Sequence, residues 1–210
     1  MKRMSKKGIL VVISGFSGAG KGTVMKGIMD RYPDYSLSIS ATTRVPRKGE
    51  KEGVHYFFKT VPEFEQMIRD HKFIEYARYV DHYYGTPKEY VEKQLDSGRD
   101  VILEIDLQGA LEVKKKYPET LLLFVTPPNA EELVKRLKDR GTESDMQIRG
   151  RLARAVEESK SMVKYDYIVV NDDIDTCVTH IHEMIQIQHD ASIHQKEFIS
   201  RICEELKEEV

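Results

Sequence analysis

The chain has 210 residues, of which 40% are hydrophobic and 32% are charged, and its formal net charge is −2. This length fits one α/β domain with insertions, or at most two small domains, and it allows a sizeable core. The composition excludes a disordered chain, and the lack of a basic excess disfavours a protein that holds DNA or RNA by its backbone. Basic residues still cluster at 44–51 and 136–154, which suits a small anionic ligand.

The cysteines and the start of the chain bear on its location. Cys177 and Cys203 are the two cysteines and lie far apart, a spacing that disfavours a disulfide framework or a structural zinc site. The apolar run 9–13 is too short for a signal-peptide core, and no stretch has the length and apolarity of a membrane span. We therefore expect a cytoplasmic protein without membrane or nucleic-acid partners.

Short apolar runs alternate with helical patterns along most of the chain. Strands are expected at 9–14, 35–40, 101–106, 121–125 and 167–171. Helices are expected at 23–31, 108–116, 129–139 and 144–164, with one long helix or two in the remainder. This alternation predicts a parallel central sheet covered on both faces, which is a three-layer α/β/α fold.

Residues 40–90 break this rhythm. The polar stretch 41–53 predicts a long loop, and strands are expected at 55–58 and 73–80 with a turn at 81–85. Such short strands favour a small separate sheet rather than a continuation of the central one.

Two helix starts can be identified in this segment. Thr60 and Glu63 have the spacing of a capping box and predict a helix to about residue 70. Thr86 followed by Pro87 has the pattern of an N-cap with proline at the first helical position. That second helix is expected to end at Gly98, a suitable residue for a helix C-terminus.

A glycine-rich turn joins the first predicted strand to the first predicted helix, which is the context of a phosphate-binding loop. Its residues are Gly15, Phe16, Ser17, Gly18, Ala19, Gly20, Lys21, Gly22 and Thr23. Glycines let the backbone N–H groups turn inward around an anion, and Lys21 would reach the β- and γ-phosphates of a nucleoside triphosphate. The alternative is a strand–turn–helix with glycines for tight packing.

Gly22 departs from the general pattern, which has Ser or Thr directly after the lysine. Thr23 follows one position later. It would support Mg²⁺ directly or through water, or it would only help the helix to start.

Several further motifs together indicate which molecule accepts the phosphoryl group. They are Ser40 to Arg47, then Gly49-Glu50, Tyr56, Phe73 to Tyr76, Tyr83 to Thr86, Leu103 to Gly109 and Ile168 to Asp173. In this order and spacing the chain closely resembles the guanylate kinases, a family of P-loop nucleoside monophosphate kinases, from about residue 8 to residue 190. Glu104 stands where an aspartate would be more usual. The resemblance implies a core at 1–39, 93–128 and 160–210, a small α+β GMP-binding insertion at 40–92, and a helical lid at 129–159.

By this resemblance, the GMP phosphate is held by Arg44, Arg47, Tyr56 and Tyr84. Two guanidinium forks and two phenols suit a dianionic phosphate, although a solvated basic loop and half-buried sheet tyrosines are the alternatives.

The same resemblance indicates which residues contact the guanine base. Glu75 would accept hydrogen bonds from guanine N1–H and N2–H₂, whereas adenine presents a lone pair at N1 and would be rejected. Ser40, Thr86 and Asp106 match the other guanine-side positions. For Thr86 a capping role alone, and for Ser40 a plain strand end, stay open.

The resemblance also assigns the lid arginines Arg136, Arg140 and Arg151, with Asn171 on the adenine of ATP. Arginines on a closing segment stabilise the charge of the transferred group and exclude water, although helix-surface pairing with acids is the alternative. Asn171 as a turn residue also stays open. The catalytic set is Lys21, Arg44, Arg136, Arg140 and Arg151.

The implied reaction is Mg²⁺-dependent transfer of a phosphoryl group from ATP to GMP in purine metabolism and GMP recycling. The attacking GMP phosphate is already ionised, so no general base is assigned. The ATP side comprises the turn residues from Gly15 and Ser17 to Thr23 together with Arg136 and Asn171, and Mg²⁺ is expected near Thr23 and Asp106. A catalytically inactive binding module and a kinase with another acceptor are the competing hypotheses. The use of dGMP and homo-oligomerisation stay open.

Overall fold

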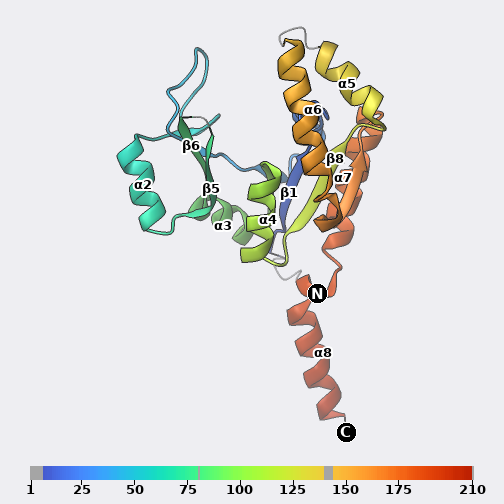
Figure 1. The fold of residues 1–210 in the computed structure, drawn as a ribbon. Coiled ribbons are helices and arrows are strands. Elements are labelled where there is room, and N and C mark those ends of the chain that lie inside the picture. The colour runs from blue at the N-terminus through green and yellow to red at the C-terminus, as the bar shows by residue number, and fades with distance from the viewer. Residues whose placement is uncertain (1–6, 80, 140–143, 210) are drawn as a thin grey trace.

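A five-stranded parallel sheet forms the centre of the computed structural model, which describes residues 7–79, 81–139 and 144–209 (Figure 1). In the order β2-β7-β1-β8-β9, its strands are Tyr35–Leu37, Asp100–Glu104, Leu10–Gly15, Leu121–Thr126 and Tyr167–Val170. All neighbouring strands are parallel. The central strands are runs of Val, Ile, Leu and Phe that are buried on both faces, as a parallel sheet requires. The predicted α/β fold class is confirmed.

Helices cover this sheet on both faces. They include α1, α3, α4 and α7, with bounds Lys21–Arg31, Lys88–Asp96, Leu107–Lys116 and Ile174–Gln188. The chain passes from β1 through α1 to β2 at one edge, and from β7 through α4 to β8 in the opposite direction. Because both crossovers are right-handed, α1 and α4 lie on opposite faces. α7 packs beside α1 and against β9. The core between these layers includes the fully buried side chains of Ile13, Ile102 and Leu122.

A second, smaller sheet is formed by residues 41–87, as the broken rhythm of this segment predicts. In the order β4-β3-β6-β5, its strands are Phe57–Phe58, Ala41–Thr42, His82–Pro87 and Phe73–Tyr79. Helix α2, Val61–Arg69, starts with the predicted capping box between Thr60 and Glu63. The buried cluster is only Ala41, Phe64 and Phe73, with the rings of Phe64 and Phe73 stacked 4.4 Å apart.

Two expectations for this segment are wrong. Residues 82–85 belong to strand β6, which pairs antiparallel with β5 from Tyr79↔His82 to Tyr76↔Gly85, so the predicted turn is not at 81–85. Gly85 serves close packing rather than a turn, because a Cβ there would lie 2.9 Å from Cβ of Tyr76 and 3.0 Å from the Glu75 carbonyl oxygen. The predicted loop at 41–53 begins with the short strand β3.

Helices α5, Ala130–Asp139, and α6, Asp145–Ser159, lie next to each other at one end of the molecule (Figure 1). Asn129 accepts a hydrogen bond from the Glu132 N–H, as expected of the residue before α5, and Ser144 and Gln147 form a capping box at the start of α6. The helix predicted to reach residue 164 ends earlier, and a 3₁₀ turn follows at Met162–Lys164 (η1).

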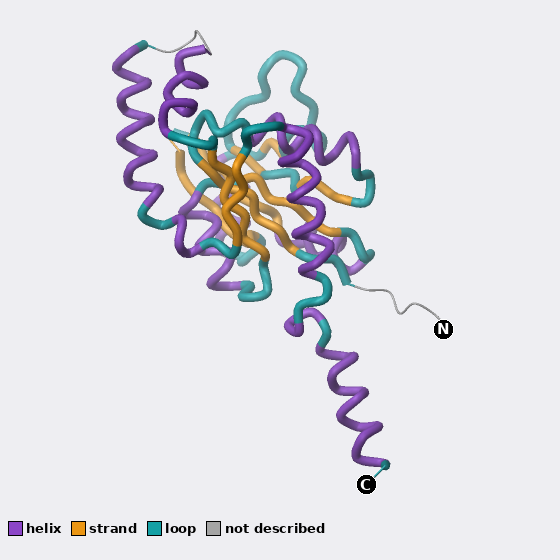
Figure 2. The backbone as a smooth tube through the Cα atoms, turned by 90° about the vertical axis from the view of Figure 1, so that its right-hand side faces the viewer, coloured by secondary structure: helices purple, strands orange, loops and turns teal. Residues whose placement is uncertain are grey.

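The C-terminal segment forms two helices. After α7, a 3₁₀ turn at Ser192–His194 (η2) leads into α8, Lys196–Glu208, which extends away from the rest of the molecule (Figures 1 and 2). Within the described part of the chain, no helix combines the length and apolarity needed to cross a membrane.

Candidate functional site

The glycine-rich turn connects β1 to α1 at the carboxyl edge of the central sheet. Gly18 and Gly20 have φ values of 94° and 87°, in the left-handed region where side chains are disfavoured. Gly20 is the N-cap of α1 and provides no side chain for the helix N-terminus. The turn thus presents backbone amides and a positive helix end to the solvent side of the sheet, as an anion site requires.

Lys21 folds back over this turn. Its ammonium donates to the carbonyl oxygens of Gly15 at 2.8 Å and Phe16 at 3.1 Å. These bonds hold a positive charge directly beside the turn, where a triphosphate would lie.

Asn171, directly after β9, is hydrogen-bonded to the same turn. Its side chain is 3% exposed, and its amide donates to the Ala19 carbonyl oxygen at 2.8 Å. A Cβ on Gly20 would lie 2.5 Å from the Asn171 amide nitrogen, so a side chain at position 20 would clash with Asn171. This contact goes beyond the role of a turn former, and the expected contact with adenine stays a prediction.

Two of the three arginines that the family resemblance assigns to a lid contact the turn. Arg136 on α5 reaches the Ala19 carbonyl oxygen at 3.5 Å and pairs with Glu132 at 2.8 Å. Arg151 on α6 donates to the hydroxyl of Ser17. The pairing with Glu132 is the helix-surface pattern that the sequence leaves open, but both arginines also contact the turn. Arg140 lies outside the described residues.

A cavity of about 570 Å³ opens above the turn. It is lined by the turn itself, by the carboxyl end of β7 with the start of α4, and by one face of α6. The lining residues are Gly15, Ser17, Lys21, Glu104, Ile105, Asp106, Leu107, Gln147, Gly150, Arg151, Arg154 and Glu158. Cations therefore face this cavity from two sides.

A second cavity, of about 160 Å³, lies between the central and small sheets. It is lined by Leu37, Ser38, Ser40, His55, Tyr56, Thr86, Leu103, Glu104 and Ile105. Because Glu104 and Ile105 line both cavities, the two meet at the carboxyl end of β7. Open α/β sheets bind ligands at this end of their strands.

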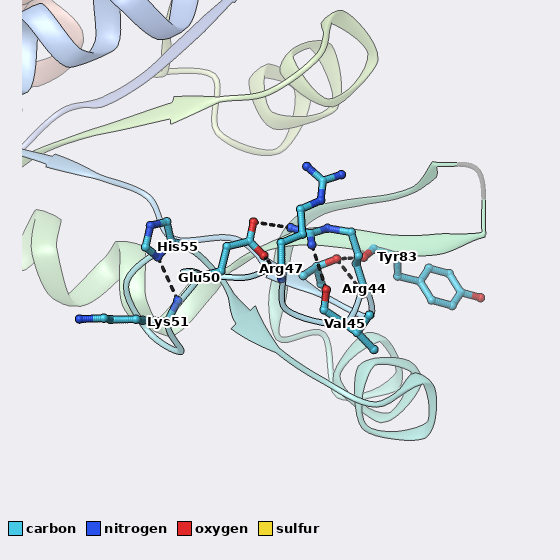
Figure 3. A network of polar contacts seen from close by, with 8 residues as sticks. Arg44, Val45, Arg47, Glu50, Lys51, His55 and Tyr83 are labelled. Atoms are coloured by element: carbon cyan, nitrogen blue, oxygen red, sulfur yellow. Dashed lines mark hydrogen bonds and ion pairs between the residues drawn. The ribbon is translucent and has the colours of Figure 1, made fainter.

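The loop after β3 is organised around Arg44 (Figure 3). Its guanidinium donates to Glu50 at 2.8 Å and to the Val45 carbonyl oxygen at 2.9 Å, and it lies 5.3 Å from the centre of the Tyr56 ring. The Arg44 side chain is only 11% exposed, so the alternative of a solvated basic loop is wrong for this residue. The side chain of Arg47 is exposed.

Glu50 fixes the shape of this loop. Hydrogen bonds from the Arg44 side chain and from the Arg47 backbone N–H, the latter 2.7 Å long, lower the pKa of Glu50 to about 2. In turn, the hydrogen bond with Glu50 raises the pKa of Arg44 above its usual value. Tyr84 lies edge-on to Tyr56 with ring centres 6.1 Å apart, so the predicted phosphate ligands Arg44, Tyr56 and Tyr84 are neighbours.

Glu75 on β5 is buried at the junction of the small sheet and the core. The hydroxyl of Thr86 donates to its Oε1 at 2.6 Å, and burial raises the pKa of Glu75. Thr86 therefore does not cap α3, as the N-cap is Pro87 and makes no side-chain hydrogen bond. The capping prediction is wrong because β6 continues through Thr86 and turns its hydroxyl toward Glu75.

Asp106 has two roles at the start of α4. Its Oδ1 accepts from the Gly109 N–H at 2.9 Å and caps the helix, while Oδ2 lies 3.8 Å from Arg154 on α6. Asp106 lines the larger cavity beside the turn rather than the smaller one. Burial raises the pKa of Glu104, and the positive charge of Lys21 opposes that shift.

The structure adds two residues to the predicted site, Glu50 and Arg154. The importance of Glu50 depends on the loop that brings it back to Arg44, although the short spacing Arg44, Arg47, Glu50 is a usable signal. Arg154 sits three residues after Arg151 and therefore on the same face of α6, a helical spacing that could have identified it.

The larger cavity fits a hard divalent cation. Three carboxylates line it, those of Glu104, Asp106 and Glu158, and Lys21 lines it as well. Among the described residues no group of three or more His, Cys, Asp or Glu side chains could hold a metal alone. Mg²⁺ commonly uses one or two carboxylates together with substrate phosphates and water, which agrees with this donor set. Thr23 is exposed and does not line the cavity.

Comparison with known proteins identifies the family. The model of the family "Guanylate kinase" matches residues 7–188. The guanylate kinase of Caldanaerobacter subterraneus subsp. tengcongensis is 50% identical over 202 residues, which are 96% of this chain and 98% of that protein. The guanylate kinase of Latilactobacillus sakei is 48% identical over 187 residues, 89% of this chain and 92% of that protein. The crystal structure of guanylate kinase from Anaplasma phagocytophilum superposes with a TM-score of 0.68 at 30% identity over 87% of each chain. This chain belongs to the guanylate kinase family.

Proposed function

We propose that this chain transfers the γ-phosphoryl group of ATP to GMP, forming ADP and GDP, as its family membership implies. The observation that carries this function is the meeting of two cavities at the carboxyl end of β7. One faces the glycine-rich turn. The other is lined by Thr86, which donates to Glu75, and by Tyr56, which lies beside Arg44. A donor and an acceptor bound in them would have their phosphates side by side. The cytoplasm is the proposed location, as the sequence predicts.

On the donor side, the turn from Gly15 to Thr23 would hold the ATP phosphates through its backbone amides and Lys21. Arg136 and Arg151 already contact this turn from the lid helices. In the transfer, negative charge spreads over the moving phosphoryl oxygens, and fixed cations stabilise it. We assign this role to Lys21, Arg136 and Arg151, and we extend it to Arg140 by family resemblance.

On the acceptor side, Arg44, Arg47, Tyr56 and Tyr84 would bind the GMP phosphate. Arg44 is pre-oriented by Glu50, so its guanidinium would bind without a large loss of side-chain freedom. The acceptor phosphate carries its own negative charge, so its oxygen attacks without a protein base.

Guanine recognition is assigned to Glu75. Its Oε1 already accepts from Thr86, and the remaining acceptor positions of the carboxylate would face N1–H and N2–H₂ of guanine. In a buried site an unpaired acceptor is costly, so adenine would be rejected. Ser40 and Thr86 line the smaller cavity and complete the base side of this proposal.

Magnesium would be held by the ATP phosphates together with Glu104 and Asp106. When bound, Mg²⁺ neutralises part of the phosphate charge and orients the transferred group. The protein residues around it exclude water and align the two nucleotides.

The test is product formation across a set of monophosphates. Purified protein with ATP and Mg²⁺ is supplied with GMP, dGMP, IMP or AMP, and the diphosphate formed is quantified by chromatography. GMP should be phosphorylated efficiently. IMP keeps N1–H but lacks the 2-amino group, so it should react more slowly, and AMP should be nearly inert. A preference for AMP, or no GDP from GMP, would contradict the proposal.

A further inference from the structure

Strand β5 connects the two hydrophobic clusters of the molecule. Phe73 belongs to the buried cluster of the small sheet, whereas Ile74 is buried in the core of the central sheet. Glu75, the next residue, is the one to which we assign guanine recognition. Helix α4 lies against β5 (Figure 1). The position of Glu75 therefore depends on how α4 and β6 hold this strand.

The pairing of β5 with β6 is irregular at Glu75. Phe73 lies opposite Pro87 and Tyr76 lies opposite Gly85, and the register shifts between these two pairs. Two residues of β5, Ile74 and Glu75, thus face the single residue between Gly85 and Pro87, which is the arrangement of a β-bulge. A bulge redirects side chains and interrupts the ladder of backbone hydrogen bonds, so its shape needs contacts from outside the sheet.

Lys116 in the last turn of α4 makes such a contact. Its ammonium donates to the Ile74 carbonyl oxygen at 2.7 Å, inside the bulge and directly before Glu75. A hydrogen bond from a charged donor is among the stronger ones. It joins the bulge of the small sheet to a helix of the central layer.

The first turn of α4 faces the other oxygen of the Glu75 carboxylate. A Cβ on Gly109 would lie 3.3 Å from Oε2 of Glu75, which is closer than an ordinary van der Waals contact. Because Oε1 accepts from the Thr86 hydroxyl, β6 contacts one carboxylate oxygen and α4 lies against the other. The N-terminal end of a helix also favours a negative charge.

We infer that α4 positions Glu75 for guanine through two residues, Lys116, which holds the bulge of β5, and Gly109, which leaves space for Oε2. This inference rests on the proposed function, because it requires Glu75 to contact the base. Lys116 and Gly109 line neither of the two cavities, so both are positioning residues that act through Glu75.

The charge of Lys116 supports the same role. Burial raises the pKa of Glu75, and the negative charge of Asp106 adds to that rise, whereas the Thr86 hydroxyl and the positive charge of Lys116 oppose it. An ionised carboxylate accepts hydrogen bonds on both oxygens, which is what N1–H and N2–H₂ of guanine require. Lys116 thus favours the accepting form of the group whose place it holds.

The first experiment compares steady-state kinetics with GMP and with AMP. Lys116→Met removes the donor but keeps the apolar stem, and the ratio of kcat/KM for GMP to that for AMP should fall about 10-fold. The KM for GMP should rise, with kcat and the KM for ATP little changed. Lys116→Arg keeps a cationic donor and should restore most of the ratio. Lys115→Met, at the adjacent exposed position, is the matched control and should match the unmodified chain.

The ratio separates positioning from a merely structural role. If Lys116 only stabilised the small sheet, its loss would lower kcat/KM for GMP and for AMP by the same factor. Equal losses, or an unchanged ratio in Lys116→Met, would overturn the inference while leaving the proposed function intact. No GDP from the unmodified chain would overturn both.

The second experiment is a double-mutant cycle between Lys116→Met and Glu75→Gln, with the same ratio as its readout. Because Lys116 acts through the Glu75 carboxylate, adding Lys116→Met to Glu75→Gln should lower the ratio much less than it does in the unmodified chain. A full additional loss in the double variant would mean that Lys116 acts independently of Glu75 and would overturn the inference.

The third experiment adds a methyl group at Gly109. Alanine is the better helix former, so Gly109→Ala should keep its melting temperature. The methyl group should displace Oε2 of Glu75 and lower the ratio about 3-fold, because small misplacements of a binding group reduce turnover of its substrate. An unchanged ratio, or a lower melting temperature with equal losses for GMP and AMP, would overturn the role given to Gly109.

Discussion

The two sheets of this protein achieve order in different ways. The five-stranded sheet rests on a large apolar core, and the phosphate-binding turn above it is held by β9, α5 and α6 through Asn171, Arg136 and Arg151. The four-stranded sheet and α2 share a small buried cluster of Ala41, Phe64 and Phe73. Two of the strands are two residues long, and the loop after β3 is shaped by the Arg44–Glu50 ion pair. The five-stranded sheet is thus fixed mainly by burial, whereas the small sheet has little buried core and its loop depends on polar contacts.

Because of this difference, substitutions at the two sides should affect the stability of the fold and the binding of substrate to different degrees. On the donor side, removing one charged group should leave the fold intact, because the core does not depend on it. On the acceptor side, the charged groups that we propose to bind substrate also order the loop, so their removal should weaken binding first and local order second.

The largest effect is expected from Lys21→Ala. Loss of the ammonium beside the turn should lower kcat by about 10³-fold, because the charge that develops on the transferred group loses its nearest cation. The melting temperature should be nearly unchanged. Lys26→Ala, at an exposed position on the same helix, is the control and should keep full activity. A folded Lys21→Ala protein with normal turnover would contradict the assignment of the phosphate-binding turn.

The next largest effect is expected from Glu75→Gln. The amide offers one acceptor where the carboxylate offers two, so the ratio of kcat/KM for GMP to that for AMP should fall by about 10²-fold. Steady-state kinetics with both nucleotides measures this ratio. Glu89→Gln, in the exposed first turn of α3, should leave it unchanged. An unaltered ratio in Glu75→Gln would remove this residue from base recognition.

Arg44→Ala should have a moderate effect that is confined to the acceptor. We expect the KM for GMP to rise about 10- to 100-fold, the range for a lost hydrogen bond to a charged group, with little change in the KM for ATP. Arg69→Ala, on the exposed side of α2 in the same small domain, provides the comparison. The reverse pattern, with ATP affected more, would move Arg44 to the donor side.

Glu50→Gln should have the smallest effect, and that effect should depend on pH. The folded pKa of Glu50 is about 2, below its ordinary value of 4.5, so the charged form stabilises the fold above pH 4.5 and this contribution is lost as pH falls toward 2. Thermal unfolding of the native chain and the variant should therefore differ at neutral pH and converge in acid. Glu65→Gln, at a half-buried position on α2, should show no such convergence. A difference that grows in acid would refute the role of the Arg44–Glu50 pair.

The parts of the site that could be predicted are those encoded locally. The turn from Gly15 to Thr23, strand β1 and the capping box at Thr60 depend on short-range spacing, and the structure has them close to where the sequence predicts. The strand predicted at 35–40 is shorter and spans Tyr35–Leu37. The capping prediction for Thr86 is wrong because a threonine before a proline has the pattern of a cap whether or not its hydroxyl has a distant partner. Its partner, Glu75, is eleven residues away across a hairpin, and only the strand pairing brings them together.

Gly85 illustrates the same limit. In sequence the glycine that ends the segment 81–85 favours a turn, but here the absence of a side chain lets β5 and β6 approach closely. The two roles of Asp106 likewise could not be separated in advance, since a strand-end carboxylate can cap the next helix, face a ligand, or do both.

The hydrogen bond from Asn171 to the Ala19 carbonyl has a thermodynamic consequence for ligand capture. Because the turn is already tied to β9 through a buried amide, its amides need not be gathered when a triphosphate arrives, and little conformational entropy is spent at that moment. The ordering cost has been met during folding, by the same strand that completes the edge of the central sheet. The affinity of the turn for a triphosphate should therefore depend on the integrity of β9, the last strand in the sequence of the described chain.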